Sequence, residues 1–123
     1  MARITGIGGL FFRARDPQAL AAWYAEHLGI NPVPTDSTGR PWTQEAGATV
    51  FAPFPADTDY FPPERQWMLN LRTNDLDTLA ARLSEAGIEV RTDPDWNSVE
   101  IGRFARIEDP EGNPIELWEP AEP

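Results

Sequence analysis

Two stretches of the chain repeat one another at an interval of about 59 residues, and this repeat constrains the fold more than any other feature. Residues 13–30 read RARDPQALAAWYAEHLGI, and residues 72–88 read RTNDLDTLAARLSEAGI. An Arg, an Asp, a Leu and an Ala pair recur at a spacing of 59 residues, and a Gly-Ile pair recurs at a spacing of 58. Two copies of this length nearly fill the 123 residues. The sequence therefore predicts one domain over residues 1–123, made of two modules at about 1–62 and 63–123.

Each copy carries the start and stop signals of a helix. In the first copy Asp16 is a favourable N-cap, Pro17 suits the first helical position, and Gly29 supplies the C-terminal stop. In the second copy Asp75 and Gly87 take the same roles. Apolar side chains recur along one side of each segment, which is typical of a helix that packs on a sheet.

Alternation of side-chain type predicts a strand before each helix, over 9–14 and 68–73. Further strands are expected near 30–34, 41–45, 48–53, 88–92, 101–107 and 114–118. Four prolines make the segment 53–65 an extended loop, and the sequence DPEGNP at 109–114 is a turn. The pattern indicates an α+β fold of two tandem β-α-β-β-β modules, with the helices outside and strand faces lining a concave interior.

Composition excludes several kinds of chemistry. The chain has no Cys, so disulfides and thiolate nucleophiles are excluded, and all ten basic residues are Arg, so lysine Schiff bases are excluded. A net charge of −10 argues against binding to nucleic acid. The sequence contains no apolar run long enough to span a membrane and no secretory signal at its start, so a cytoplasmic location is expected. Six acidic residues and no Arg lie in 108–123, which either solubilises the chain or favours cationic ligands.

The twin segments "FFRARDPQALAAWYAEHLGI" and "LNLRTNDLDTLAARLSEAGI", together with the ending "FARIEDPEGNPIELWEP", resemble the vicinal oxygen chelate superfamily. That group includes glyoxalase I, bleomycin-resistance proteins, extradiol dioxygenases and methylmalonyl-CoA epimerase. The resemblance implies a mixed sheet curled into a cup around a ligand cavity, and a homodimer. It does not specify a reaction, because this fold hosts several unrelated activities.

The resemblance also implies where a metal would be bound in members that use one. The first-strand ligand position, seven residues before each capping Asp, is Gly9 in the first module and Met68 in the second. The last-strand position of the first module falls near 49–51, where there is no carboxylate. Only Glu116 keeps the ligand type of the family, and Gly and Met are poor ligands for a hard divalent metal. We therefore expect no metal and no cofactor.

Glu116 lies between Ile115 and Leu117, so its side chain is expected to face away from the helices and into the cup beside Trp118. There it is either a solvated side chain or a buried group that acts as a general base or anchors a cation. Its conceivable partners are Asn70, Arg72, Arg13 and Arg106. Arg106 is favoured because it lies on the adjoining strand of the same hairpin, and an ion pair between the two is expected to be structural more often than catalytic.

Gly9 opposite Met68 leaves room in the cup, bordered by Phe11 and Phe51. Such a surface suits a flat apolar ligand, although the same residues would also serve as core. Aromatic residues fall near strand ends and loops, where they either stack on a ligand or pack in a dimer; they are Trp42, Trp67, Trp96, Tyr60 and Phe61. The candidate ligand-binding residues are Gly9, Phe11, Arg13, Trp42, Phe51, Met68, Asn70, Arg106 and Trp118, with Glu116 as the candidate catalytic residue.

Three functions remain open from the sequence. The first is a metal-free cup that binds a small aromatic or cationic organic molecule, as bleomycin-resistance proteins do. The second is a cofactor-independent isomerase or lyase in which Glu116 is the base and Arg106 or Asn70 polarises a carbonyl. The third is a metal-dependent glyoxalase or dioxygenase with ligands elsewhere in the chain.

Overall fold

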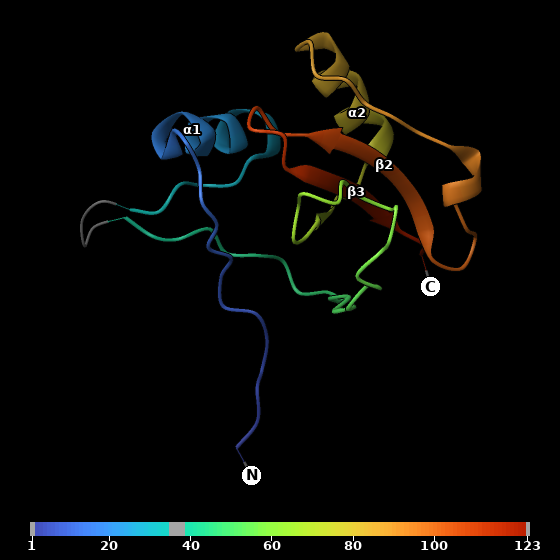
Figure 1. The fold of residues 1–123 in the computed structure, drawn as a ribbon, viewed down its shortest axis with the longest axis horizontal. Coiled ribbons are helices and arrows are strands. Elements are labelled where there is room, and N and C mark those ends of the chain that lie inside the picture. The colour runs from blue at the N-terminus through green and yellow to red at the C-terminus, as the bar shows by residue number, and fades with distance from the viewer. Residues whose placement is uncertain (1, 35–38, 123) are drawn as a thin grey trace.

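The computed structural model describes residues 2–34 and 39–122 (Figure 1). Its elements, in chain order, are α1 (Pro17–Leu28), β1 (Leu69–Arg72), α2 (Leu76–Glu85), the short 3-10 helix η1 (Pro94–Trp96), β2 (Gly102–Glu108) and β3 (Pro114–Pro120). The fold is therefore of the α+β class. No helix among the described residues is long and apolar enough to cross a membrane.

The three strands form one mixed sheet in the order β1-β3-β2. β3 pairs with β1 in parallel and with β2 in antiparallel orientation. The strands predicted near 68–73, 101–107 and 114–118 are confirmed. The strand predicted near 88–92 is reduced to a single bridge between Arg91 and Arg106.

Both helices begin and end as the sequence predicts. The Asp16 side chain accepts a hydrogen bond from the Ala19 N–H, and the Asp75 side chain accepts one from the Thr78 N–H, so each carboxylate satisfies a free donor of the first turn. Gly29, after α1, and Gly87, just beyond α2, both have a positive φ, which glycine adopts without steric strain.

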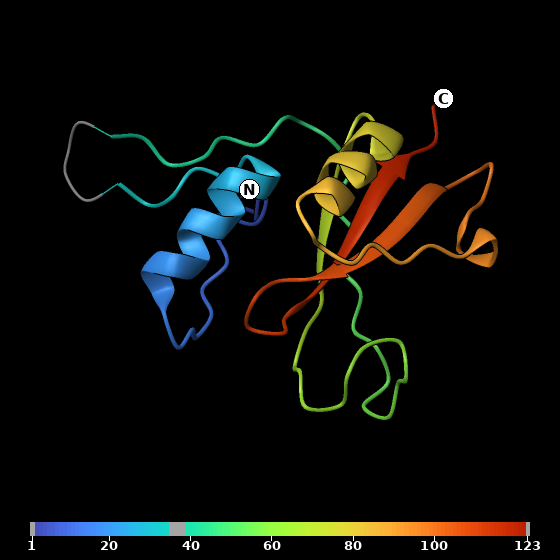
Figure 2. The ribbon, with the colours of Figure 1, turned by 90° about the horizontal axis from the view of Figure 1, so that it is seen from above.

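One face of the sheet is apolar and packs in the core (Figure 2). Its fully buried side chains come from β2 and β3, and the helices add further residues to the same cluster. The members of this cluster are Leu20, Tyr24, Leu76, Leu83, Ala105, Ile107, Ile115 and Leu117. Because side chains alternate along a strand, the residues between these must face the other way.

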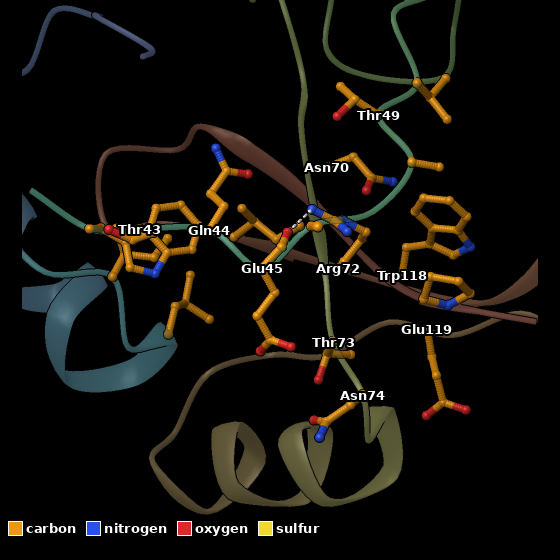
Figure 3. Close-up of a pocket in the computed structure, with 18 of the residues that line it drawn as sticks. Thr43, Gln44, Glu45, Thr49, Asn70, Arg72, Thr73, Asn74, Trp118 and Glu119 are labelled. Atoms are coloured by element: carbon orange, nitrogen blue, oxygen red, sulfur yellow. Dashed lines mark hydrogen bonds between the residues drawn. The ribbon is translucent and has the colours of Figure 1, made fainter. Parts of the chain in front are cut away.

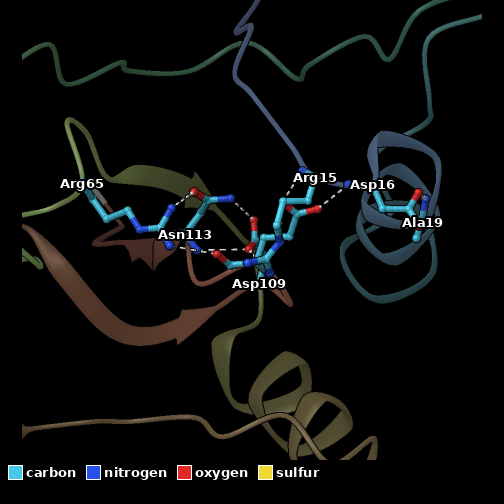
Figure 4. Close-up of polar contacts among 7 residues, drawn as sticks. Arg15, Asp16, Ala19, Arg65, Asp109 and Asn113 are labelled. Carbon is cyan, nitrogen blue, oxygen red and sulfur yellow. Dashed lines mark hydrogen bonds and ion pairs between the residues drawn. The ribbon is translucent and has the colours of Figure 1, made fainter.

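The turn at 109–114 joins α1 to the sheet (Figure 4). The buried Asp109 carboxylate accepts four hydrogen bonds: from the backbone N–H of Glu111 and of Asn113, from the Asn113 amide, and from the Tyr24 hydroxyl of α1 at 2.6 Å. The Glu111 carboxylate accepts hydrogen bonds from the backbone N–H groups of Arg15 and Asp16 at the start of α1. The turn thus anchors the first helix to the second half of the chain.

The strands predicted in the first half are absent. Over the described parts of 2–68 there is α1 but no strand, so the expectations at 9–14, 30–34, 41–45 and 48–53 are wrong for the single chain. These segments are largely exposed, and none of them pairs with β1, β2 or β3 in the described sheet. The tandem modules and the curled cup therefore remain predictions.

Candidate functional site

The face of the sheet opposite the core carries polar and aromatic side chains in two rows. Pairing places Asn70, Glu116 and Arg106 side by side across β1, β3 and β2. The next row along the same face is formed by Arg72, Trp118 and Phe104. We call these six residues the open face. The Trp118 and Phe104 rings stack at 6.2 Å with an interplanar angle of 4°.

Glu116 is buried at the centre of this face, which is one of the two positions that the sequence left open. The Asn70 amide donates a hydrogen bond to its Oε1 at 2.7 Å, and the Tyr60 hydroxyl donates a short hydrogen bond to its Oε2. Both carboxylate oxygens are therefore satisfied by protein donors, which is how a buried charge is held without water.

Arg106 is also buried, but it does not form the predicted ion pair with Glu116. No carboxylate of the described residues lies within 4.0 Å of its guanidinium. Instead its Nη2 donates to the Tyr60 carbonyl oxygen at 2.9 Å, and its guanidinium carbon lies 4.7 Å from the centre of the Tyr60 ring. Tyr60 thus contacts both charged groups, the phenol hydroxyl meeting Glu116 and the ring meeting Arg106.

The sequence places Tyr60 among the loop aromatics that stack on a ligand or pack in a dimer, but it does not predict the contact of Tyr60 with Glu116. Burial and the hydrogen bond to Glu116 raise its pKa above the usual tyrosine value, while Arg106 opposes the shift, so the phenol stays protonated as a donor. The Phe54 ring packs against both Tyr60 and Phe61, within the proline-rich loop. In the sequence, Tyr60 is an aromatic residue in a loop that contains four prolines. That pattern does not indicate which strand the side chain contacts.

A cleft of about 570 Å³ opens between the segment 42–50 and the ends of the neighbouring strands β1 and β3 (Figure 3). Aromatic side chains at its wall are Trp42, which is 40% exposed, and the buried Trp118. The end of α1 contributes Leu28, and Ile30 follows it. The charged residues that line the cleft are Glu45, Arg72, Glu119 and Glu122. Its size is within the range of pockets that hold drug-sized ligands.

Arg72 lies in the middle of this cleft (Figure 3). Its Nη2 donates to the Glu45 carbonyl oxygen at 3.1 Å. The guanidinium also lies against Gly47, where a Cβ atom would stand 1.6 Å from Nη1. A larger residue at position 47 would therefore displace the guanidinium from this place.

The residues at the expected metal positions do not fit a metal ion. Gly9 offers no side chain, and Met68 offers a thioether. Glu116 has both oxygens engaged by Tyr60 and Asn70. Within the described ranges 2–34 and 39–122, no group of three or more His, Cys, Asp or Glu side chains is arranged to hold a metal.

The structure brings some of the predicted site residues together and leaves others apart. Asn70, Arg106, Glu116 and Trp118 share the open face, and Trp42, Asn70 and Trp118 line the cleft. Met68 is half-buried just before β1 and does not line the cleft. The predicted residues of the first module that lie on extended, exposed segments outside the cleft are Gly9, Phe11, Arg13 and Phe51.

The model of the glyoxalase-like domain family matches residues 9–118 of the chain. Among solved structures, an antibiotic binding protein from Streptomyces sp. CB03234, TnmS3, is 28% identical, with a TM-score of 0.63 over 98% of this chain and 100% of that one. A glyoxalase/bleomycin resistance protein from the same organism is 30% identical over 85% of this chain and 91% of that one, with a TM-score of 0.49. A superfamily member from Sphaerobacter thermophilus DSM 20745 is 22% identical over 86% and 90%, with a TM-score of 0.51. No curated protein matches the chain.

Proposed function

Because the chain belongs to the glyoxalase-like domain family, we propose that it acts as a metal-free binding protein for a small aromatic or cationic organic molecule. The observation that carries the proposal is the cleft of about 570 Å³ beside the open face, with Trp42 and Trp118 at its wall. Large rings at a concave surface provide contact area with little loss of side-chain entropy. The similarity to an antibiotic binding protein along nearly the whole chain supports the same reading.

The state of Glu116 favours binding over catalysis. Tyr60 and Asn70 each donate a hydrogen bond to one oxygen of Glu116, so two of its about four lone-pair sites are already used within the protein and the carboxylate is less available to a substrate as a general base. Glu116 is thus best explained as the group that holds the Tyr60 loop on the sheet.

Two measurements on metal-stripped protein test this function. Thermal-shift titration with nickel, zinc, manganese and iron(II) is expected to leave the melting temperature unchanged, whereas a ligand at 100 times its Kd would add about 2.7 kcal/mol. Calorimetric titration with aromatic compounds is expected to find binding that Trp42→Ala weakens. Val99→Ala, at an exposed position outside the cleft, is the control. A clear metal-induced shift, or equal effects of the two variants, would contradict the proposal.

The alternative is a cofactor-independent isomerase or lyase in which Glu116 is the base. This alternative is favoured by the position of the buried Glu116 carboxylate, which lies on β3 between its strand partners Asn70 on β1 and Arg106 on β2. Glu116→Gln distinguishes the two functions. It abolishes turnover of a candidate substrate if the carboxylate is the base, but it changes only affinity if the chain is a binding protein.

We further propose that the binding unit is a homodimer and that the tandem modules, at about 1–62 and 63–123, form the expected cup in it. In the single chain, several large apolar side chains of the first half are largely exposed: Ile4, Phe11, Val50 and Phe51 are 91%, 93%, 68% and 82% exposed. Water contact over so much apolar surface is unfavourable, and a second copy would cover it.

A further inference from the structure

The cleft is lined by charges of both signs, so its ligand could be a cation bound by carboxylates or a molecule with an oxygen acceptor bound by Arg72. The surroundings of Arg72 distinguish these two kinds of ligand. Its guanidinium is the one cation among the described residues that line the cleft, and the side chain is half-buried at the end of β1. Of its five N–H donors, one meets an acceptor within residues 2–34 and 39–122, the Glu45 carbonyl oxygen.

No carboxylate of residues 2–34 and 39–122 pairs with Arg72, in a chain with 20 acidic and 10 basic residues. Arg15, Arg91 and Arg103 each have a carboxylate oxygen within 4.0 Å. Among residues 2–34 and 39–122, none lies that close to Arg72. An arginine without an ion-pair partner, half-buried in a cleft of so acidic a protein, retains donors for a ligand.

The backbone at 45–47 lies over the guanidinium, and the Glu45 carbonyl oxygen accepts one of its hydrogen bonds at 3.1 Å. The segment at Gly47 approaches so closely that a Cβ atom there would stand 1.6 Å from Nη1. A donor fork held in place before binding loses less entropy when it meets an acceptor.

The carboxylates of the cleft are weaker candidates for recognition. Glu45 and Glu122 are exposed, where water screens their charges. Glu119 already accepts a hydrogen bond from the Leu76 N–H at the start of α2, at 2.7 Å. Among the charges of the described residues at this site, Arg72 is therefore the one that is partly shielded from water and has no charged partner in the described part of the chain.

We propose that Arg72 recognises an oxygen acceptor, a carboxylate or carbonyl group, on an aromatic ligand bound in the cleft. Paired N–H donors on a planar guanidinium match such an acceptor in geometry. The inference rests on the proposed binding function and narrows it, because it disfavours a simple cation as the ligand.

The test is calorimetric titration of the protein with three probes that share one ring system: 2-naphthoate, 2-naphthamide and 2-naphthylmethylammonium. Wild-type protein is expected to bind the first two more tightly than the third. Arg72→Met should weaken 2-naphthoate binding by about 10-fold to 100-fold. Arg82→Met makes the same change in net charge at an exposed position on α2 outside the cleft, and it should bind 2-naphthoate as wild type does.

Gly47→Ala provides a second variant that keeps the arginine but displaces its guanidinium, and it should also weaken 2-naphthoate binding. If 2-naphthoate binds Arg72→Met as well as wild type, or if 2-naphthylmethylammonium binds most tightly, the inference is overturned while the binding function stands. If none of the three probes binds wild-type protein, both the inference and the proposed function fail.

Discussion

Tyr60 and Glu116 connect the proline-rich loop to the sheet through one hydrogen bond between side chains. The direction of Glu116 could be predicted from its apolar neighbours, and the closeness of Arg106 from the hairpin, because alternation and register are local properties of strands. The contact of Tyr60 with Glu116 could not be predicted, because a loop has no periodicity from which the position of a side chain follows. The insertion of Tyr60 also explains why Arg106 donates to the Tyr60 carbonyl instead of pairing with Glu116.

Tyr60→Phe tests this connection. The change removes the donor to a buried carboxylate and keeps the ring on Arg106, so the free energy of unfolding should fall by about 1 to 2 kcal/mol. Urea denaturation followed by tryptophan fluorescence measures the loss. Thr92→Val removes a hydroxyl from an exposed position and should have little effect; a loss of equal size there would contradict the account.

Tyr24 should make the free energy of unfolding depend on pH in the alkaline range. Burial, followed by the hydrogen bond to Asp109, raises its pKa above the ordinary value of 10.0. Above pH 10 the unfolded chain loses this phenolic proton while the native protein keeps it, so the free energy of unfolding should decrease as pH rises. Urea midpoints at pH 8 and pH 11 should show a smaller decrease for Tyr24→Phe than for wild type. Identical decreases would contradict the assigned cause.

At the scale of elements, the helices could be predicted from the sequence because their signals are local, whereas strands of the first half could not. The two helices have caps and stops within their own segments, so Asp16 and Asp75 identify them without reference to the rest of the chain. A strand needs a partner, and the extended segments of the first half have none in the single chain, so alternation over 9–14 does not produce one. The DPEGNP turn was predicted, but not the hydrogen bond that Tyr24 donates to Asp109, because Tyr24 reaches the turn from 85 residues away.

Asp109→Asn should destabilise the whole assembly of turn, α1 and sheet. An amide directs its own N–H groups at donors from Tyr24 or Asn113 and leaves buried polar atoms unpaired. We expect the free energy of unfolding to fall by at least about 2 kcal/mol, measured by urea denaturation. Glu108→Gln changes the adjacent, exposed carboxylate and should be nearly neutral. A neutral Asp109→Asn would show that the turn does not anchor α1.

At the scale of the molecule, the first half exposes apolar surface that a second copy would cover. The sequence repeat predicts two equivalent modules, yet the described strands of the single chain all belong to the second. Because pairing between copies is not encoded in any local pattern, its geometry could not be predicted from the sequence. The dimer proposed above supplies a physical reason for this asymmetry.

Sedimentation equilibrium at micromolar concentration should give twice the mass of the chain. Phe11→Glu puts a charge on the exposed apolar surface and should shift the protein toward monomer. Val99→Glu makes the same change at a position that is 96% exposed near the β2 end of the sheet, and it should leave the dimer intact. A monomeric wild type would refute the dimer.

The most direct test of the central claim, that the cleft binds an aromatic molecule without a metal, uses the five tryptophans as reporters. Metal-stripped protein with nitrogen-15 in its indole groups is titrated with 2-naphthoate and followed by NMR. The account predicts that the Trp42 and Trp118 indole signals, from the two tryptophans that line the cleft, shift and saturate while those of Trp23, Trp67 and Trp96 stay in place. Shifts confined to the latter three, or shifts that require an added divalent metal, would contradict it.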